Sequence, residues 1–477
     1  MIPTIVKNMS LKIFNTLTGE KEQFIPLAKG QVRMYVCGVT VYDSAHVGHA
    51  RSLLTFDIIY RYLRFLGYQV DFVRNFTDVD DKIIKKANDE GVGCETITGR
   101  YIEEFYREVE SLGLLQPTAE PRATLHIPEI IALIQRLEDH QLAYRVDGDV
   151  FYPVQKFPGY GKLSGKKIDE LEAGARVEID ERKRSPLDFA LWKSSKPNEP
   201  IWDSPWGPGR PGWHIECSAM STKYLGQPFD IHGGGRDLMF PHHENEIAQS
   251  EGAFEQPLAR YWIHNGLLTV NGEKMSKSLG NYFTIQEILQ EHDSVALRHL
   301  FLGSHYRNPM DFSREALQEA GKAADRIYET IDRAERAVGE LNNVPEANLL
   351  DDFRREMDDD FNTPRALALI FDEVRALNRL LDEKKPDGVA ARTAALKTMC
   401  EVLGLLQDSP EGFFNRKKNR WLRREGLTGE QIERWIVERN QARKEKNWQE
   451  ADRIRQQLLD KGILVEDTSG GTAWKVR

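Results

Sequence analysis

The chain has 477 residues, a length that predicts roughly three domains. Charged residues make up 29% of the sequence, and no apolar run reaches the ~20 residues that a membrane-spanning helix needs. These features argue against an integral membrane protein. Residues 1–10 lack the apolar stretch of a secretory signal, so we expect a cytoplasmic protein.

The cysteines and the charge set further limits. Four cysteines, at positions 37, 94, 217 and 400, are too far apart in sequence for a disulfide framework, and in a reducing compartment such thiols are packed, catalytic or metal-bound. The net charge of −9 argues against a nucleic-acid partner, but residues 414–477 hold sixteen Lys and Arg against ten Asp and Glu. This tail carries +6 and the remainder −15, a pattern compatible with RNA binding or with a solvated face.

The first predicted unit is a βαβ motif. Alternating apolar residues over 32–36 indicate a buried strand that stops at Cys37, and a long amphipathic helix begins near His46. A second strand follows at 70–73, so the sheet is expected to be parallel. The candidate caps of the helix are Asp43 and Ser44.

Two histidines stand at the start of this helix. His46 and His49 are three residues apart and share one face at the positive helix end, beside amides that suit a polyphosphate. The alternative is that one histidine caps or packs and the other is solvated.

Beyond the first unit, residues 121–211 read as an insertion with one helix over 128–140. The second half of the sheet begins near Gly212. It is expected to contain a helix with Trp213 and Cys217, a strand at 229–232, and a glycine run at 233–235 that allows close backbone approach to a ligand. A helix from Pro241 and a strand at 261–264 follow, and this strand leads to Lys274 and Lys277.

The C-terminal third is predicted to be helical. Apolar periodicity marks four helices with short connections, which favours an antiparallel bundle; they cover residues 317–341, 353–361, 363–377 and 396–405. A small α+β module follows, with helices around Ile432 and Leu458 and strands at 463–465 and 473–476.

A metal site is one interpretation of four scattered residues. His242 and Glu246 are four apart on one helix face, and Cys37 and Cys217 could supply thiolates. The alternative is that both cysteines are packed hydrophobes, since no Cys-x-x-Cys pair occurs.

Two motifs connect these observations. His-Val-Gly-His at 46–49 is similar to the first signature of class I aminoacyl-tRNA synthetases, and Lys-Met-Ser-Lys-Ser at 274–278 matches the second. Over nearly the whole chain the sequence resembles the cysteinyl-tRNA synthetase family. The segments that carry this resemblance are residues 35–38, 161–164, 212–220, 240–246 and 358–364.

The resemblance implies a set of site residues. Its zinc ligands correspond to Cys37, Cys217, His242 and Glu246; His243 would point about 100° away on a regular helix. The residues that would bind ATP are His46, His49, Lys274 and Lys277. The remaining cysteine pocket would consist of Thr77, Trp213, His232 and Asp237.

The resemblance also implies an activity: L-cysteine and MgATP form cysteinyl-adenylate, and cysteine passes to the 3′ end of tRNA(Cys). Zinc would select the substrate thiolate, or else play a purely structural role. Two alternatives are a mycothiol-pathway cysteine ligase, which is expected to lack a full anticodon-binding region, and a non-catalytic zinc-stabilised RNA-binding paralogue. We expect a monomer.

The implied architecture is α/β, a Rossmann-like parallel-sheet catalytic domain with an insertion, then a helical bundle and a small α+β module. The ranges are 1–120 and 212–312 for the catalytic halves, 121–211 for the insertion, 313–410 for the bundle and 411–477 for the module. In the tail, Arg416, Lys417, Lys418, Arg423 and Arg424 are candidate phosphate contacts and Trp421, Trp435 and Trp474 candidate stacking residues, although Trp435 and Trp448 have helical spacing typical of a core.

Overall fold

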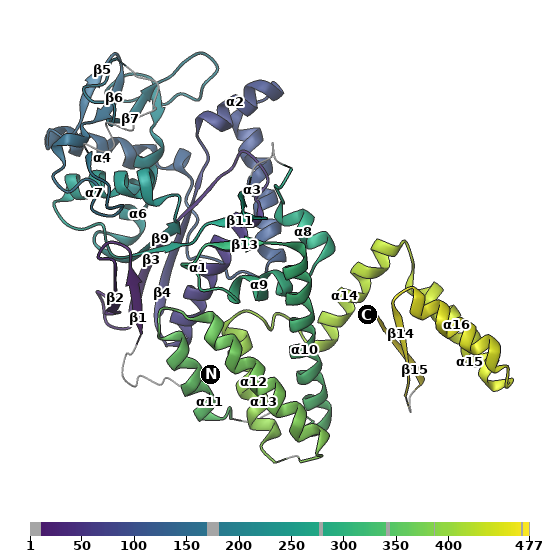
Figure 1. Ribbon diagram of the computed structural model, residues 1–477. Helices are drawn as coiled ribbons and strands as arrows, with labels where there is room; N and C mark the ends of the chain where they lie inside the picture. Colours follow the sequence, from purple (N-terminus) through teal and green to yellow (C-terminus); the bar gives the residue numbers. More distant parts are fainter. Residues whose placement is uncertain are drawn as a thin grey trace.

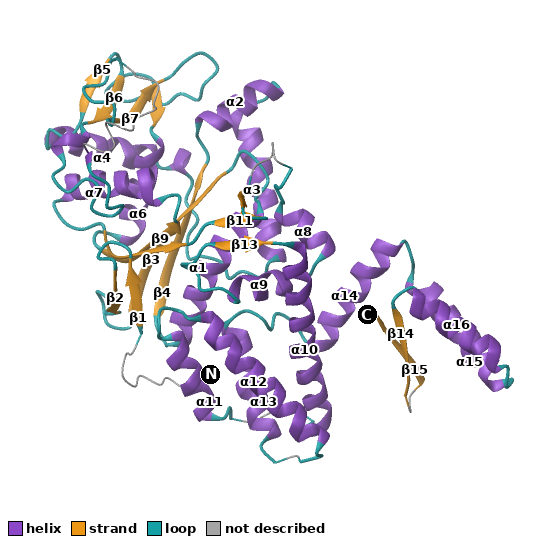
Figure 2. Ribbon diagram, in the orientation of Figure 1, coloured by secondary structure: helices purple, strands orange, loops and turns teal. Residues whose placement is uncertain are grey.

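The computed structural model describes residues 11–168, 181–275, 280–339, 344–385, 387–468 and 471–476. Its centre is a parallel sheet in the order β10-β9-β3-β4 (Figures 1 and 2). The strands are β3 (Gln31–Thr40), β4 (Gln69–Thr77), β9 (Phe229–Gly235) and β10 (Ala259–Asn265). The α/β prediction is confirmed, and the order reverses between β3 and β9, where such sheets bind ligands.

Strand β3 divides the molecule by the alternation of its side chains. Met34 and Val36 face α1 (Val47–Phe65) and the bundle, whereas Tyr35 and Cys37 face the opposite layer. That layer contains α6 (Trp213–Leu225) and α7 (Glu244–Phe254). The alternation therefore turns the Cys37 thiol toward the helices that carry Cys217 and Glu246.

Two local predictions about β3 and α1 are wrong. The strand does not stop at Cys37 but continues to Thr40 after a register shift between Val36 and Val39. Neither Asp43 nor Ser44 caps the helix, because His46 occupies that position. Residues 45–47 pair with residues 283–285, and this pairing holds His46 at the start of the helix.

The described part of the insertion contains more regular secondary structure than we expected. It contains α4 (Ile127–Asp139), as expected, and an antiparallel sheet in the order β5-β6-β7-β8 that was not predicted. The strands are β5 (Tyr144–Val146), β6 (Asp149–Tyr152), β7 (Phe189–Ser194) and β8 (Gly209–Pro211). Its apolar residues share one core with α6 and α7, so the insertion buttresses those helices.

Short elements connect the sheet to the bundle. A small sheet consists of β11 (Leu268–Val270), β12 (Glu273–Lys274) and β13 (Met310–Phe312). Two helices, α8 (Ile285–Glu291) and α9 (Ser294–Leu302), share a core with this sheet (Figure 1). The first half adds α2 (Asp81–Glu90) and α3 (Cys94–Ser111), and an N-terminal hairpin pairs β1 (Lys12–Asn15) with β2 (Glu20–Gln23).

The helical bundle has its four expected helices: α10 (Arg314–Val338), α11 (Ala347–Met357), α12 (Thr363–Asp382) and α13 (Val389–Val402). Leu341, expected in the first of them, lies outside the described residues, and Phe361 is buried beyond the end of α11. The bundle shares a core with one face of the catalytic sheet.

The terminal module has the predicted two helices and strand pair: α15 (Gly429–Lys444), α16 (Trp448–Asp460), β14 (Ile463–Thr468) and β15 (Gly471–Val476). A further helix, α14 (Pro410–Glu425), was not predicted. It is held to α10 of the bundle by the ion pair of Lys417 with Asp325, and to the start of α9 by that of Arg420 with Asp293, at 2.8 Å.

The tryptophans of the tail differ from their expected roles. Trp421 and Trp474 are buried, and Lys418 Nζ lies 3.4 Å from the Trp474 ring centroid, so neither indole presents a free face for stacking. Trp435 packs partly buried against the same core, but Trp448 is 58% exposed, and its prediction as a core residue is wrong.

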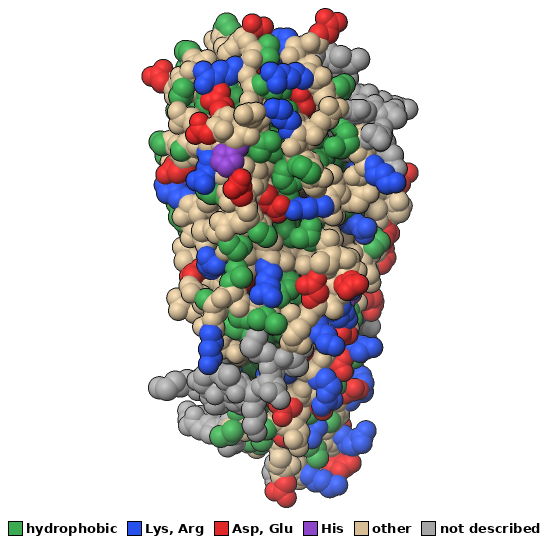
Figure 3. Space-filling view, turned by 90° about the vertical axis from the view of Figure 1, so that its left-hand side faces the viewer, with side chains coloured by type: hydrophobic (Ala, Val, Ile, Leu, Met, Phe, Trp, Pro, Cys, Tyr) green, Lys and Arg blue, Asp and Glu red, His purple; other side chains and the backbone are tan. Residues whose placement is uncertain are grey.

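The surface is of mixed charge. In Figure 3, Lys and Arg side chains are interspersed with Asp and Glu over one face of the molecule, with small hydrophobic areas between them. Among the described helices, none combines the length and the apolar character needed to cross a bilayer.

Glu108 in α3 provides a test of buried charge. It is 5% exposed, and neither carboxylate oxygen has a hydrogen-bond partner among the described residues. Burial and the nearby Glu104 raise the pKa of Glu108 to about 8. In the unfolded chain the pKa of a glutamate is ~4.3. The contribution of Glu108 to the free energy of unfolding is therefore most favourable below that pH and is lost as the pH rises through about 8.

We therefore expect Glu108→Gln to stabilise the protein by about 1–2 kcal/mol more at pH 8.5 than at pH 4. Denaturant unfolding at the two pH values measures the difference. Glu103→Gln, an exposed site on the same helix, is the control. An equal effect of Glu108→Gln at both pH values contradicts the assignment.

Candidate functional site

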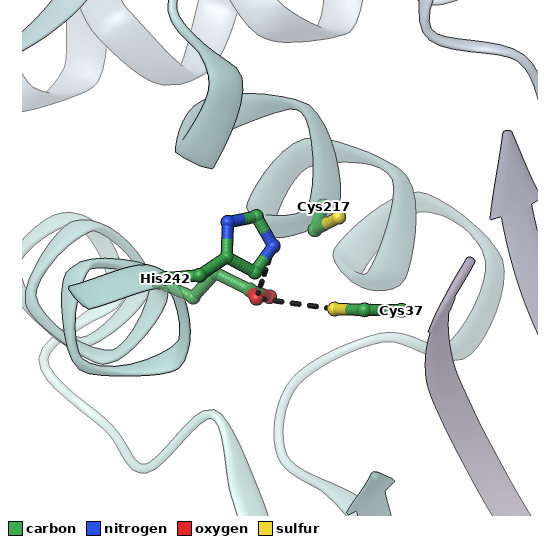
Figure 4. A group of neighbouring side chains, drawn as sticks. Cys37, Cys217 and His242 are labelled. Atoms are coloured by element: carbon green, nitrogen blue, oxygen red, sulfur yellow. Dashed lines mark hydrogen bonds and ion pairs between the residues drawn. The ribbon is translucent and has the colours of Figure 1, made fainter. Parts of the chain in front are cut away.

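Four side chains from three parts of the chain meet beside the carboxyl end of β3. They are Cys37 from β3, Cys217 from α6, His242 from the turn η3 (Met239–His243) and Glu246 from α7; one donor atom of each lies within 4.8 Å of all the others. Figure 4 shows Cys37, Cys217 and His242 pointing toward one another. The structure brings together the four residues that the sequence singled out as metal ligands.

The contacts within this cluster are short. Cys37 Sγ donates to Glu246 Oε1 at 3.3 Å, and His242 Nε2 lies 3.1 Å from the same oxygen. Cys217, His242 and Glu246 are buried, and Cys37 is half-buried. Two thiols, an imidazole and a carboxylate are ligands that Zn²⁺ binds, and zinc can expand to five ligands when a substrate group joins them. The donor set therefore fits zinc.

Protonation of the cluster also suits a cation. Burial raises the pKa of the Cys37 thiol, whereas the hydrogen bond with Cys37 lowers the pKa of Cys217 to about 6. Burial opposes charge on His242, but the Glu246 carboxylate prevails and raises its pKa to about 10. Burial also disfavours ionised Glu246, yet His232 and His242 hold its pKa well below the usual value. At neutral pH the ionised Cys217 and Glu246 thus surround a protonated His242, which releases its proton when a metal binds.

Further histidines surround the cluster. His232 Nε2 lies 2.8 Å from Glu246 Oε2, and His214 Nδ1 lies 2.9 Å from His242 Nδ1. The indole of Trp262 stacks on His232 with ring centroids 4.3 Å apart. These contacts fix the orientation of both Glu246 and His242, as partners behind metal ligands do.

His243 does not point away from the cluster as expected. The set Cys37, His232, His243 and Glu246 also has donor atoms within 4.8 Å of one another, and residues three apart, such as His243 and Glu246, are neighbours on a helix surface. However, His243 Nδ1 lies 2.8 Å from His264 Nε2. This second set contains only one thiol, and its His243 already contacts His264. It therefore suits zinc less well than the set with Cys217 and His242.

The sequence did not single out Asn75. This residue of β4 is 1% exposed, and its Oδ1 accepts a hydrogen bond from the Gly38 amide at 2.9 Å and lies 3.7 Å from Cys217 Sγ. It holds the turn after Cys37 against the cluster. A polar residue inside a buried strand was the available signal.

The residues expected to complete a cysteine pocket lie at the same edge of the sheet, with different accessibilities. Thr77 is buried at the end of β4, and His232 is completely buried behind Glu246. Trp213 begins α6 with 38% of its surface exposed, and its ring centroid lies 4.5 Å from that of His242. Asp237 follows β9 and is exposed. Its carboxylate lies against Gly235, since its Oδ1 is 2.4 Å from the position that a Cβ on this glycine would occupy.

His46 and His49 form a reciprocal cap on α1. His46 Nδ1 accepts from the amides of Gly48 and His49 at 3.1 and 3.3 Å, His49 Nδ1 accepts from the His46 amide at 3.2 Å, and the rings stack 3.7 Å apart. The amides expected to meet phosphate are thus occupied. Because each Nδ1 accepts, a neutral ring carries its proton on Nε2, which can donate to phosphate. Burial and His46 lower the pKa of His49 to about 3, which keeps it neutral.

The second signature lies beside this cap. Lys274 ends β12, and Lys277 falls in 276–279, outside the described residues. The described residues before and after 276–279 both lie close to α1. Met275 Cε is 3.3 Å from the position that a Cβ on Gly48 would occupy, and Phe283 O accepts a hydrogen bond from Val47 N at 2.9 Å. The two motifs are therefore neighbours in space.

Three family models match the chain. The model described as the tRNA synthetases class I (C) catalytic domain matches residues 23–322, a DALR domain model matches 352–407, and a cysteinyl-tRNA ligase anticodon binding domain model matches 428–474.

Curated relatives match from end to end. A protein of Syntrophobacter fumaroxidans is 53% identical and one of Geobacter sulfurreducens is 54% identical; each alignment covers 98% of this chain and 100% of the relative, and each relative is named cysteine–tRNA ligase. Among solved structures, Mycobacterium tuberculosis methionyl-tRNA synthetase in complex with methionyl-adenylate is 18% identical, with a TM-score of 0.57, over 79% of this chain and 90% of that one. At that identity the likeness shows the fold alone.

Proposed function

This chain belongs to the cysteine–tRNA ligase family of class I aminoacyl-tRNA synthetases, and we propose that it selects its substrate with a zinc ion held by Cys37, Cys217, His242 and Glu246. The ligase activity of this family (EC 6.1.1.16) joins L-cysteine to tRNA with ATP. The observation that carries the proposal is the convergence of four zinc-competent donors within 4.8 Å at the ligand-binding edge of the sheet.

In the first step, the carboxylate of cysteine attacks the α-phosphorus of MgATP, and pyrophosphate leaves. In the second, a 3′-terminal hydroxyl of tRNA(Cys) attacks the acyl carbon, and AMP leaves. We assign phosphate contacts to the Nε2 atoms of His46 and His49, which the reciprocal cap orients. Lys274 and Lys277 would stabilise the charge that develops on pyrophosphate. Positioning and charge stabilisation replace a side-chain nucleophile.

Substrate selection rests on sulfur chemistry. In an apolar pocket, one methylene or one hydroxyl is worth only ~1–3 kcal/mol of discrimination. Zinc bound in the cluster supplies a soft Lewis acid that favours a thiolate over a serine hydroxyl. The role of His232 is to orient Glu246 from behind, while Thr77, Trp213 and Asp237 line the pocket; Asp237 would pair with the substrate ammonium.

Trp213 offers a test of the pocket wall. We expect Trp213→Ala to raise the KM for cysteine about 10-fold with little change in kcat, because the indole contributes apolar contact in the ground and transition states alike. Cysteine-dependent ATP–pyrophosphate exchange without tRNA measures both constants. Trp448→Ala, at a more exposed tryptophan in the terminal module, is the control. A fall in kcat with unchanged KM contradicts the assignment.

The decisive experiment for the proposed function is the same exchange with and without a strong chelator, with serine as the competing substrate. We expect cysteine-dependent exchange in the metal-loaded protein and no exchange after the chelator has removed the metal. Charging of tRNA then separates this enzyme from a mycothiol-pathway ligase, and absence of exchange would identify a non-catalytic paralogue. Cysteine preference that survives in metal-free, folded protein contradicts zinc selection.

The partners follow from the family. Its anticodon-binding models cover the bundle and the terminal module, which would hold tRNA, with tRNA(Cys) as the substrate. Arg423 and Arg424 remain candidate phosphate contacts, whereas Arg416 pairs with Asp408 just before α14 and Lys417 pairs with Asp325 of α10. We propose that the enzyme acts as a cytoplasmic monomer.

A further inference from the structure

Arg51, in the second turn of α1, is a buried cation. It is 2% exposed, and no carboxylate among the described residues pairs with it. Its Nη1 donates to the carbonyl of Leu267 at 3.0 Å, and its Nη2 donates to the carbonyl of Asn308. Burial lowers the pKa of Arg51 to about 10, so the side chain stays charged at neutral pH. A buried charge held only by peptide carbonyls is costly, and an apolar side chain would fill the same space more cheaply.

The two carbonyls belong to the base of the small sheet that leads to the second signature. Leu267 O also accepts from Met310 N at 3.0 Å, and Gly266 N donates to Tyr306 O at 2.8 Å. β11 and β13 then run parallel from this point, and β11 pairs with β12 through Thr269 and Lys274. The guanidinium thus holds the residues just before β11 and β13 against α1.

The other end of the same segment is also attached to α1. His46 forms a bridge with Thr284, and Ile285 N donates to Ala45 O at 2.9 Å. The chain that carries Lys274 and Lys277 therefore leaves α1 at Arg51 and returns to it at His46. A planar guanidinium, with its fixed fork of donors, can set the distance and angle between two carbonyls in a way that a flexible ammonium cannot.

We propose that Arg51 is a positioning residue for adenylate formation: it fixes the β11–β12 hairpin to α1, so that the start of the second signature is held beside His46 and His49. This role rests on the proposed function of those residues. It concerns only the step in which pyrophosphate leaves, because transfer to tRNA involves no pyrophosphate.

The test compares two rates in Arg51→Met, in the full-length, metal-loaded chain. We expect the rate of adenylate formation to fall about 10- to 100-fold, the loss typical of misplaced catalytic groups, with the KM for cysteine unchanged. Single-turnover transfer from enzyme-bound cysteinyl-adenylate, accumulated beforehand and freed of ATP, should stay within about 2-fold of the wild-type rate. Should Arg51→Met fail to fold, the same comparison is made in Arg51→Lys, which keeps the charge and loses the fork.

Arg33 provides the matched control. Its guanidinium also donates to two carbonyls, those of Leu225 and Pro228, at 2.5 and 2.8 Å, but at the opposite end of β3. Arg33→Met should leave both rates unchanged in the folded protein. Equal losses in both steps for Arg51→Met, or no loss in adenylate formation, would overturn the proposal. A wild-type protein without cysteine-dependent exchange contradicts the proposed function instead.

Discussion

Replacing Cys217 with alanine is expected to lower the kcat/KM for cysteine activation by about 10³-fold or more, and to reduce the preference for cysteine over serine to what an apolar pocket provides, about 10- to 200-fold. The thiol is buried on α6, and within the cluster its pKa is lowered, so it is the donor best prepared to bind zinc as thiolate. Its loss leaves three ligands and a weakened site.

Pyrophosphate exchange with each amino acid, together with the zinc content of the purified protein, measures both effects. Cys94→Ala is the control, because that cysteine is half-buried beside Tyr42 and Tyr101, in a separate group of residues. Thermal unfolding of both variants checks that the fold persists. A Cys217→Ala protein that binds no zinc but still prefers cysteine as strongly as the wild type contradicts the account.

The second large effect is expected at Lys277. Lys277→Ala should lower the rate of adenylate formation by about 10²–10³-fold, the usual loss when one group that stabilises developing charge is removed. The KM for cysteine should change little, because the cysteine pocket lies at the metal cluster. Lys277 falls outside the described residues, so this expectation rests on the signature motif and on the neighbouring positions of Met275 and Gly48.

Rapid-quench measurement of adenylate formation, beside single-turnover transfer to tRNA, separates the two chemical steps. Lys322→Ala, an exposed lysine of the bundle that pairs with Glu319, is the control. Transfer from preformed adenylate should be unaffected by Lys277→Ala. A variant impaired equally in both steps would show that the lysine does not act on pyrophosphate.

The sequence predicted the parts of the structure that depend on local patterns. Alternation in β3, the four-residue spacing of His242 and Glu246, and the 3.6-residue period of the bundle each follow from backbone geometry alone. The convergence of the cluster followed from topology, since a parallel sheet brings the carboxyl ends of its strands to one edge.

Other features depended on tertiary contacts that no local pattern contains. His46 caps α1 because residues 45–47 pair with 283–285, which lie far away in sequence. The strands β5 and β8 have three residues each, too few for alternation to be recognised. Helical spacing identified an apolar position at Trp448 but could not tell that this side chain is exposed. Likewise, only the fold shows that His232 contacts Glu246 from behind.

X-ray absorption at the zinc edge tests the central claim most directly, with full-length, zinc-loaded protein in the presence and absence of saturating L-cysteine. We predict that cysteine adds one sulfur to the inner sphere of the metal, beside those of Cys37 and Cys217, and that serine leaves the spectrum unchanged. If calorimetry shows cysteine bound while the sulfur coordination stays the same, the metal does not select the substrate and the claim is wrong.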